Sequence, residues 1–468
     1  MSNFPAHAPS AELNAGLPLA PSLPTNHLLG HLPAMGRDPL ELFERAHRDV
    51  GDVVRMRLGP KQIVTLAHPE LLHRVLVSER DQYIKQTRGY TMLRLILGDG
   101  LVTSEGGFWR RQRRIAQPAF RRKYIAGFAN TMTTSARDMA DRWQAVADAG
   151  ATIDVAAEMM QLTLRIAGET LFSRDLTGEA HELGAAVTTV LEAFSPLTQA
   201  PIPAPHMWPT PTAHKFLRGI KVLDRVVHQI IAERRATGEP GNDLLGMFMA
   251  SVDDETGESM TDKQLRDEVM TMILAGHETT ANALAWTLYL LSKHPAVDRR
   301  VHDELAANVS DDNPAAGVMR AVPYTHQALQ ESMRLYPPVW VVGRSAVNDT
   351  ELGGYRIPQG TYVYMPVWVM HRHPALWDNP EGFDPDRFAP DRVAARKALG
   401  VHKFAHLPFS GGQRKCIGDH FAKMESLLIL AVLLQRFRLS LVPGQRVVPE
   451  ASITLRPRDG LHMRIHNR

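Results

Sequence analysis

The chain of 468 residues exceeds the usual size of a single hydrophobic core, so its length predicts either two or three domains or one large helical enzyme. Hydrophobic residues make up 44% and charged residues 22% of the chain, which excludes a disordered protein and a fibrous repeat. A net charge of +3 is too small over this length to indicate a nucleic-acid-binding protein.

The N-terminal segment has a composition of its own. Its first 36 residues contain no Lys or Arg and no apolar run of signal-peptide length, and repeated prolines interrupt any helix there. We therefore expect an extended, proline-rich segment over residues 1–35, with no secretory signal and no membrane anchor. The one cysteine, Cys416, excludes an intramolecular disulfide and a multi-cysteine metal site, and it suits a reducing compartment, so we expect a cytoplasmic protein.

Helical periodicity dominates the rest of the chain. Val53 to Leu66 is rich in β-branched residues and contains Gly59, which predicts a β-hairpin. Apolar residues at helical spacing predict helices over Pro39 to His47, Phe128 to Val146, Ile153 to Phe172, His181 to Phe194 and Phe216 to Arg235. These elements indicate a mainly α protein with a small β subdomain.

Six prolines between Pro196 and Pro211 predict a loop between two of these helices. The loop carries Met207 and Trp208, whose side chains would be exposed or would cover an apolar surface. A long loop between helices is a candidate lid over a binding site.

The longest helix is predicted from Thr261 to His294. Thr261 and Gln264 fit a capping box at its start, and Pro295 stops it. At 1.5 Å per residue it would be about 50 Å long.

The centre of this helix, residues 275–280, reads Ala-Gly-His-Glu-Thr-Thr, which is the wrong composition for a buried helix. Gly276 costs about 1 kcal/mol relative to alanine, and a buried Glu278 needs a partner or a raised pKa. A functional reason for this segment therefore outweighs a packing reason.

Cys416 lies in a glycine-rich loop, residues 409–418, directly before an apolar helix. A lone cysteine is most often a buried core residue. Here three glycines would let the backbone approach a flat group closely, and Arg414 and the helix N-terminus would place positive charge beside a thiolate. A thiolate stabilised in this way is a metal ligand or a nucleophile.

The loop resembles the haem-binding loop of the cytochrome P-450 family, whose pattern is Phe-x-x-Gly-x-Arg-x-Cys-x-Gly. The matching residues are Phe409, Gly412, Arg414, Cys416 and Gly418. The resemblance implies one P-450 domain over residues 1–468, with haem b between the long central helix and the helix after the loop. It also implies that Cys416 is the axial ligand of the iron and that Phe409, Arg414 and Gly418 bind the cofactor.

A Glu-x-x-Arg pair, Glu331 and Arg334, is the first of three further segments that agree with the family. Alone it would be a surface pair worth about 0.2 to 0.5 kcal/mol. In the family the pair is buried with an arginine from a later loop, and Arg387 stands at the expected place. We expect the three side chains to share one carboxylate and to have a structural role.

A second segment, beginning at Trp109, resembles the family's helix whose Trp and fifth-position basic residue bind a haem propionate. Trp109 and Arg113 occupy these positions, and Arg344 lies where the family often places another propionate-binding arginine. With Arg414 they form a coherent set, because carboxylates on a haem edge need cations or indole donors.

The third segment is the unusual helix centre, which resembles the family's oxygen-activating motif. Glu278 and Thr279 fit its acid–alcohol pair, and such a motif permits a helix distortion where the two side chains relay protons to dioxygen. A thiolate ligand supplies the complementary push that favours O–O cleavage.

The family's topology places the substrate between several apolar segments, including the proline-rich loop. The residues expected to line a lipophilic pocket are Met92, Leu93, Met272, Leu274, Ala275, Val339, Trp340, Val341 and Ile453. The motif around Cys416 resembles the fatty-acid and eukaryotic-type branch, so we expect fatty acids, terpenoids, steroids or similar lipids as substrates of a monooxygenase that acts as a monomer.

Electrons must come from a separate protein, because no flavin or iron–sulfur domain fits in the remaining sequence. A basic docking face for a ferredoxin or flavodoxin-type donor with its reductase is expected from Arg110, Arg111, Arg114, Arg121, Arg122, Lys123 and Lys415. Two alternatives stay open. A haem-thiolate peroxygenase or isomerase would not activate dioxygen, which Glu278 and Thr279 argue against, and a non-catalytic haem-binding sensor would need neither proton relay nor electron donor.

Overall fold

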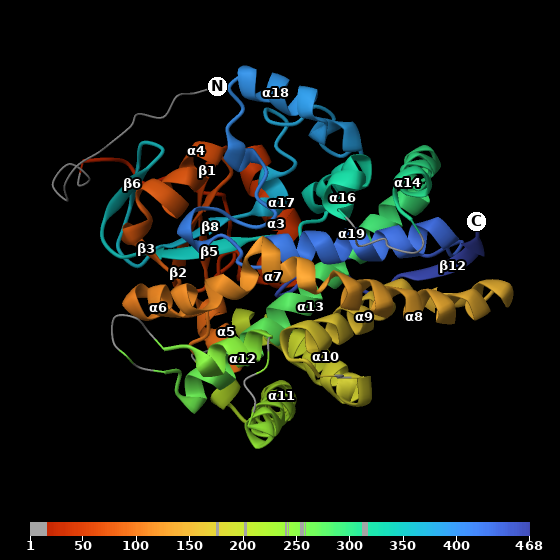
Figure 1. Ribbon diagram of the computed structural model, residues 1–468. Helices are drawn as coiled ribbons and strands as arrows, with labels where there is room; N and C mark the ends of the chain where they lie inside the picture. The colour runs from red at the N-terminus through yellow and green to blue at the C-terminus, as the bar shows by residue number, and fades with distance from the viewer. Residues whose placement is uncertain are drawn as a thin grey trace.

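Helices account for most of the molecule, and the largest sheet lies at one end of it (Figure 1). The computed structural model describes residues 16–174, 177–200, 204–238, 241, 243–252, 257, 259–310 and 317–468. The helices are α2 (Leu32–Arg37), α3 (Pro39–Asp49), α4 (Pro69–His73), α5 (Arg88–Leu97), α6 (Gly106–Ala116), α7 (Arg122–Gly127), α8 (Ala129–Asp148), α9 (Val155–Leu171), α10 (Thr177–Gln199), α11 (Pro211–Thr237), α12 (Leu244–Ala250), α13 (Asp262–Lys293), α14 (Pro295–Asn308), α15 (Val318–Ala321), α16 (Pro323–Leu335), α17 (Val367–Met370), α18 (Pro390–Ala398) and α19 (Asp419–Arg436). The strands are β1 (Val53–Leu58), β2 (Lys61–Leu66), β3 (Tyr83–Ile84), β4 (Thr152–Asp154), β5 (Val342–Ala346), β6 (Thr350–Leu352), β7 (Tyr355–Ile357), β8 (Tyr362–Met365), β9 (Phe437–Leu441), β10 (Pro449–Ala451), β11 (Leu455–Pro457) and β12 (His462–Asn467).

The largest sheet joins the two halves of the chain. Its strand order is β1-β2-β8-β5-β3, and β2 and β8 run parallel while the other neighbours are antiparallel. The predicted hairpin is confirmed: Val53 pairs with Leu66, and Gly59 in the turn has a φ of +59°, which suits glycine. The mainly α prediction is likewise confirmed.

The central helix, α13, runs through the middle of the molecule and packs against α9, α16 and α19 (Figure 1). Its predicted start is confirmed, because the side chain of Thr261 accepts from Gln264 and the side chain of Gln264 accepts from the backbone of Thr261. It ends before His294, where Pro295 opens α14. Most of its side chains are buried, so this helix can hold residues rigidly in the interior.

The extended N-terminal segment ends earlier than predicted. Residues 1–15 lie outside the described part of the chain, and residues 16–31 attach to the sheets through isolated bridges such as Ser22 with Arg55. A helix then starts at Leu32, so the predicted boundary at residue 35 is wrong. The reason is Pro33, which lies in the first turn, where proline starts a helix rather than breaking it.

The loop predicted from Pro196 to Pro211 also starts too early, because α10 continues through Pro196 to Gln199. The neighbouring side chains of Phe194 and Leu197 are buried, whereas Pro196 is exposed. Burial of this apolar face outweighs the one hydrogen bond that the proline removes. Residues 201–203 of the predicted loop lie outside the described residues.

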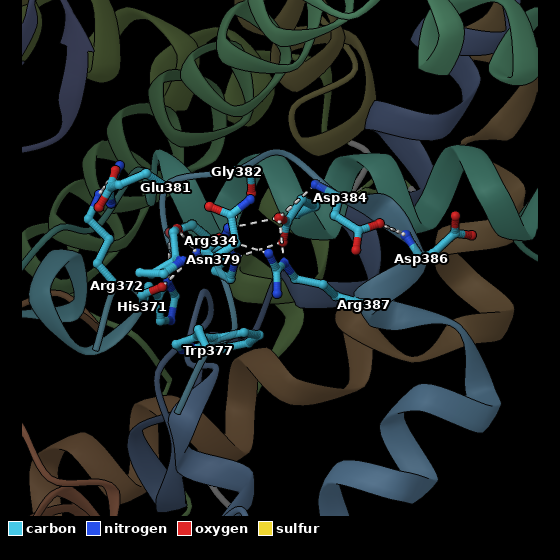
Figure 2. A network of polar contacts seen from close by, with 12 residues as sticks. Arg334, His371, Arg372, Trp377, Asn379, Glu381, Gly382, Asp384, Asp386 and Arg387 are labelled. Atoms are coloured by element: carbon cyan, nitrogen blue, oxygen red, sulfur yellow. Dashed lines mark hydrogen bonds and ion pairs between the residues drawn. The ribbon is translucent and has the colours of Figure 1, made fainter. Parts of the chain in front are cut away.

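Glu331 binds two arginines in the interior, as predicted. Arg334 donates to both of its carboxylate oxygens at 2.7 Å, and Arg387 donates to Oε1 at 3.1 Å. The backbone N–H of Asp384 adds a bond of 3.0 Å. Figure 2 shows the arginines also reaching the backbone carbonyls of the loop at residues 379–382. Every charge in the network therefore has partners, and the network fixes α16 against this loop.

Candidate functional site

The loop before α19 is shaped by a glycine and a backbone hydrogen bond. Gly412 has a φ of +69°, and a Cβ there would lie 2.2 Å from the carbonyl oxygen of Leu76, so no other residue fits without a shift of the backbone. The backbone N–H of Cys416 donates to the carbonyl oxygen of Phe409 at 3.0 Å. The side chain of Cys416 is exposed at the end of this loop, and α19 begins at Asp419.

The sulfur of Cys416 has cations beside it. Although solvent reaches the sulfur, it lies deep among protein atoms, and this desolvation raises the pKa of the thiol above its ordinary value, as does Asp419; a hydrogen bond to the backbone of Gly418 and the charges of Arg113 and Lys415 act in the opposite direction. Arg113 also donates to the carbonyl oxygen of Lys415 at 3.0 Å. The thiol therefore lies next to groups that favour its anionic form.

Arg414, which was expected to place positive charge beside the thiolate, makes its hydrogen bonds with another part of the chain. Its guanidinium lies over the ring of Trp109, 3.8 Å from the centroid, and donates to the carbonyl oxygen of Ser104 and to the carboxylate of Glu105. Its second terminal nitrogen, Nη1, is buried and has no hydrogen-bond partner among the described residues. A buried guanidinium nitrogen of this kind is suited to an anionic ligand.

The predicted cofactor-binding arginines gather around a buried lysine, Lys85. Burial lowers the pKa of Lys85 well below its ordinary value, and Arg344, Arg414 and Arg113 lower it further, with Glu105 acting in the opposite direction. Four basic side chains therefore meet one carboxylate. This excess of basic over acidic groups suits a ligand with more than one carboxylate.

The centre of α13 combines small and polar side chains. Ala275 is exposed, although Ile273, two residues earlier, is buried. The hydroxyl of Thr279 donates to the carbonyl oxygen of Ala275 at 2.9 Å, and that of Thr280 to the carbonyl oxygen of Gly276 at 3.3 Å. Both hydroxyls therefore bond to carbonyl groups one turn earlier in the same helix. The helix itself is continuous from Asp262 to Lys293.

Glu278 is buried on this helix and faces a cavity. Burial raises the pKa of its carboxyl to about 7, against the lowering effects of a hydrogen bond from Thr454 and of the charge of Arg456. Glu278 and Thr279 both line the cavity. An acid that titrates near neutral pH can give and recover a proton there.

The cavity has a volume of about 640 Å³ and lies within the usual range for a small-molecule site of roughly 300–1,000 Å³. Apolar side chains from the sheet, α5, α10 and α13 form most of its wall. Seven of the predicted pocket residues line it, namely Leu93, Leu274, Ala275, Val339, Trp340, Val341 and Ile453.

Three features of these residues suit a haem. The thiol of Cys416 is exposed at the loop, Ala275 leaves α13 open at its centre, and the buried cations include the unpartnered nitrogen of Arg414. A haem needs an axial ligand, an open face and partners for two propionates.

The comparison with protein families decides the identity. The family model for cytochrome P450 matches residues 21–462. The chain belongs to the cytochrome P450 family. The P450 is therefore an oxidoreductase with a haem-thiolate cofactor, and it inserts oxygen from O2 into a lipophilic small molecule with electrons from a redox partner.

Bacterial relatives resemble this P450 over nearly their whole length. Cyclooctatin synthase of Streptomyces melanosporofaciens is 36% identical over 94% of this chain and 92% of its own. Cyclooctat-9-en-7-ol 5-monooxygenase of the same organism is 36% identical over 89% and 88%. Pentalenene oxygenase of Streptomyces avermitilis is 34% identical over 92% and 93%.

Within the described part of the chain, each helix is either too short or too polar to traverse a membrane.

For two residues of the P450, the prediction that they line the cavity is wrong. Met92 and Met272 do not line the cavity but are buried in the helical core. Successive residues of a helix point about 100° apart, so Met92 faces away where Leu93 faces inward. Met207 and Trp208 are likewise outside the lining and are 76% and 49% exposed.

Sequence reasoning missed several cavity residues of the P450. α2, α3 and the β1–β2 turn contribute Leu32, Met35, Phe43, Leu58 and Pro60. Their helical and strand periodicity indicates only a buried face, and it does not say what that face covers.

Lys85 and Glu105 were missed as well. A Lys in a polar stretch of sequence is typical of a solvated surface, and no local pattern marks this one as buried.

Proposed function

We propose that this P450 oxygenates a compact cyclic terpenoid. The observation that carries the proposal is the apolar cavity of about 640 Å³ whose wall includes Ala275, Glu278 and Thr279. The names of the relatives support the substrate class, since they refer to pentalenene and to cyclooctat-9-en-7-ol. The apolar wall would bind a hydrocarbon skeleton by burial, with few polar groups to fix its orientation.

The proposed cofactor is haem b, whose iron the thiolate of Cys416 would bind, with Phe409 and Gly418 in the loop beside it. When bound through a thiolate, haem iron supplies dioxygen activation and favours O–O cleavage. The backbone bond from Cys416 to Phe409 would keep the loop in one shape. Arg113 and Lys415 would stabilise the negative charge on the sulfur.

The propionates of the haem would be bound by Trp109, Arg113, Arg344 and Arg414, and we add Lys85 to this set. The excess of basic side chains over carboxylates, together with the unpartnered nitrogen of Arg414, supports this assignment. Arg344 is buried and already donates to the carbonyl oxygen of Gly343, which would hold its guanidinium in place.

Glu278 and Thr279 are the proposed catalytic residues. The carboxyl of Glu278 would release a proton toward the cavity and take it back from solvent, and the hydroxyl of Thr279 would pass a proton on and hold a water molecule in place. Both side chains line the cavity from consecutive positions of α13, which supports a joint role in proton transfer.

We further propose a single domain that acts as a monomer in the cytoplasm. Strands that are far apart in the chain pair with each other, β2 with β8 in one sheet and β4 with β12 in another, which supports one folding unit.

The proposed electron donor is an acidic ferredoxin or flavodoxin with its reductase. Most of the basic side chains on and after α6 are exposed, namely Arg110, Arg114, Arg121, Arg122, Lys123 and Lys415. They lie near the loop of Cys416, since Arg122 contacts His420 at 3.4 Å. A docking face here would be close to the cofactor.

Reduction by an acidic ferredoxin should slow as salt is added, because salt screens charges on exposed surfaces. Arg121→Glu combined with Lys123→Glu should slow reduction at low salt by about tenfold. The measurement is the stopped-flow rate of reduction against ionic strength. Arg464→Glu on β12, which lies away from α6 in Figure 1, is the control and should keep the original rate. Equal salt dependence in both variants would contradict this docking face.

The substrate proposal is tested by the absorbance change that follows when a ligand displaces water from ferric haem. We expect pentalenene and other cyclic terpenoids to shift the protein from low to high spin, and linear fatty acids of similar carbon number to do so at least about tenfold more weakly. Turnover under ¹⁸O₂ should then place one labelled oxygen atom in the product. A response to fatty acids alone would overturn the terpenoid proposal, and a product without label would overturn oxygen insertion.

A further inference from the structure

The turn between β10 and β11, residues 452–454, is held by two buried tryptophans. The indole N–H of Trp340 donates to the carbonyl oxygen of Ser452 at 2.9 Å. The indole N–H of Trp286 donates to the carbonyl oxygen of Leu455 at 3.0 Å. Because an indole has a single donor, each tryptophan fixes one side of the turn.

The hydroxyl of Thr454, at the end of this turn, bridges two side chains of α13. It accepts a hydrogen bond from the side-chain amide of Asn282 at 3.0 Å and donates one to Oε1 of Glu278. Asn282 follows Glu278 by one helical turn, so both side chains lie on the same face. All three are 3% exposed.

The hydrogen bond from Asn282 determines where the hydroxyl proton of Thr454 points. A threonine hydroxyl has one proton and two acceptor sites, and the amide of Asn282 occupies one of the acceptor sites. The proton is therefore directed to Glu278. Oε1 of Glu278 accepts this hydrogen bond, whereas no hydrogen bond to its Oε2 is seen among the described residues.

The surroundings of Glu278 contain little charge. Arg456 is the one charged group among the described residues that acts on its pKa, and Arg456 itself binds Glu450 at 2.9 Å. Burial raises the pKa of Glu278, and because its hydrogen-bond partner is a neutral hydroxyl rather than a cation, the carboxyl keeps its proton up to near neutral pH. Thr454 therefore holds the group in place without fixing it as an anion.

We propose that Thr454, oriented by Asn282, is a positioning residue for proton delivery: it holds Oε1 of Glu278 and leaves Oε2 to carry the proton into the cavity. In the transfer the Oε2–H bond breaks, the proton passes to the hydroxyl of Thr279 or to a water molecule beside it, and the carboxylate takes a proton from solvent. The inference rests on the proposed role of Glu278.

The same turn also contacts the substrate side of the cavity. Ile453 lines the cavity between Ser452 and Thr454. The hydroxyl of Ser452 donates to the carbonyl oxygen of Leu191 on α10 at 3.1 Å. One rigid turn thus places a substrate contact and the support of the proton donor at a fixed distance from each other.

The test uses Thr454→Val, which removes the hydroxyl and keeps the shape, in the ferric holoprotein. The infrared band of the protonated carboxyl is titrated against pH and assigned by its loss in Glu278→Gln. We expect a midpoint near pH 7 in the parent protein and a midpoint about one pH unit higher in Thr454→Val, because a hydrogen bond to the charged form is lost. Asn282→Leu should shift the midpoint in the same direction and is the second variant if Thr454→Val does not fold.

Turnover gives an independent readout. Pentalenene is the probe, and a ferredoxin with its reductase is the electron donor. Under these conditions Thr454→Val should release about tenfold more peroxide per electron consumed. Thr454→Ser restores the hydroxyl and should restore both readouts. Thr287→Val is the matched control, because Thr287 is a buried threonine of α13 whose hydroxyl, within the described part of the chain, bonds to Ala283 alone, and it should change neither readout.

The outcomes separate the two proposals. An unchanged midpoint and unchanged peroxide release in Thr454→Val, or a failure of Thr454→Ser to restore them, would overturn the positioning role. Unchanged peroxide release in Glu278→Gln would instead overturn the proposed role of Glu278 in catalysis.

Discussion

Cys416→Ser should abolish the thiolate signature of the ferrous, carbon-monoxide-bound protein and lower turnover by more than about a hundredfold. Loss of a group that only orients a metal ligand already costs roughly 10- to 100-fold, and Cys416 is the proposed ligand itself. The exposed thiol at the loop and the cations beside it are the basis of this expectation. The measurement is the Soret band after chemical reduction, together with the haem content of the purified protein.

A neighbouring variant provides the control. Gln413→Ala changes an exposed, uncharged side chain of the same loop and should keep the red-shifted band after chemical reduction. If Cys416→Ser kept this band, the haem would have another ligand and the assignment of Cys416 would be wrong.

Glu331→Gln should lower the free energy of unfolding by about 3–5 kcal/mol, because it leaves two buried guanidinium groups without their shared carboxylate. Glu331 and Arg334 are fully buried, and Arg387 nearly so. The measurement is denaturant unfolding of the holoprotein, followed by far-UV circular dichroism and by the haem absorbance.

Figure 2 also contains the control for this variant. Glu381 pairs with Arg372 at 3.2 Å, but the side chain of Glu381 is 69% exposed. Glu381→Gln should therefore cost less than about 1 kcal/mol. Equal losses in the two variants would mean that the charge of Glu331 is not needed for stability.

The elements that sequence predicts well are those set by local patterns. Thr261 and Gln264 mark the start of α13 because a capping box is made by neighbouring residues. The hairpin around Gly59 follows from its own turn and its alternating side chains. Pro196 was misleading because its cost as a helix breaker is local, whereas the burial that outweighs it comes from distant elements.

The candidate site was only partly predictable for the same reason. Cys416 stands out through the residues around it, and Glu331 with Arg387 through the resemblance to a family. Lys85 and Thr454 act through partners far away in the chain, such as Arg344 for Lys85 and Glu278 for Thr454. No pattern within either segment indicates these contacts, so only the folded chain reveals them.

The solitary cysteine has a practical consequence for anyone handling the protein. Two copies can be linked by a disulfide only through residue 416, the side chain that would otherwise bind iron. A covalent dimer on a non-reducing gel therefore consists of molecules whose residue 416 no longer binds the cofactor, and its abundance gives a minimum for the inactive share of a preparation.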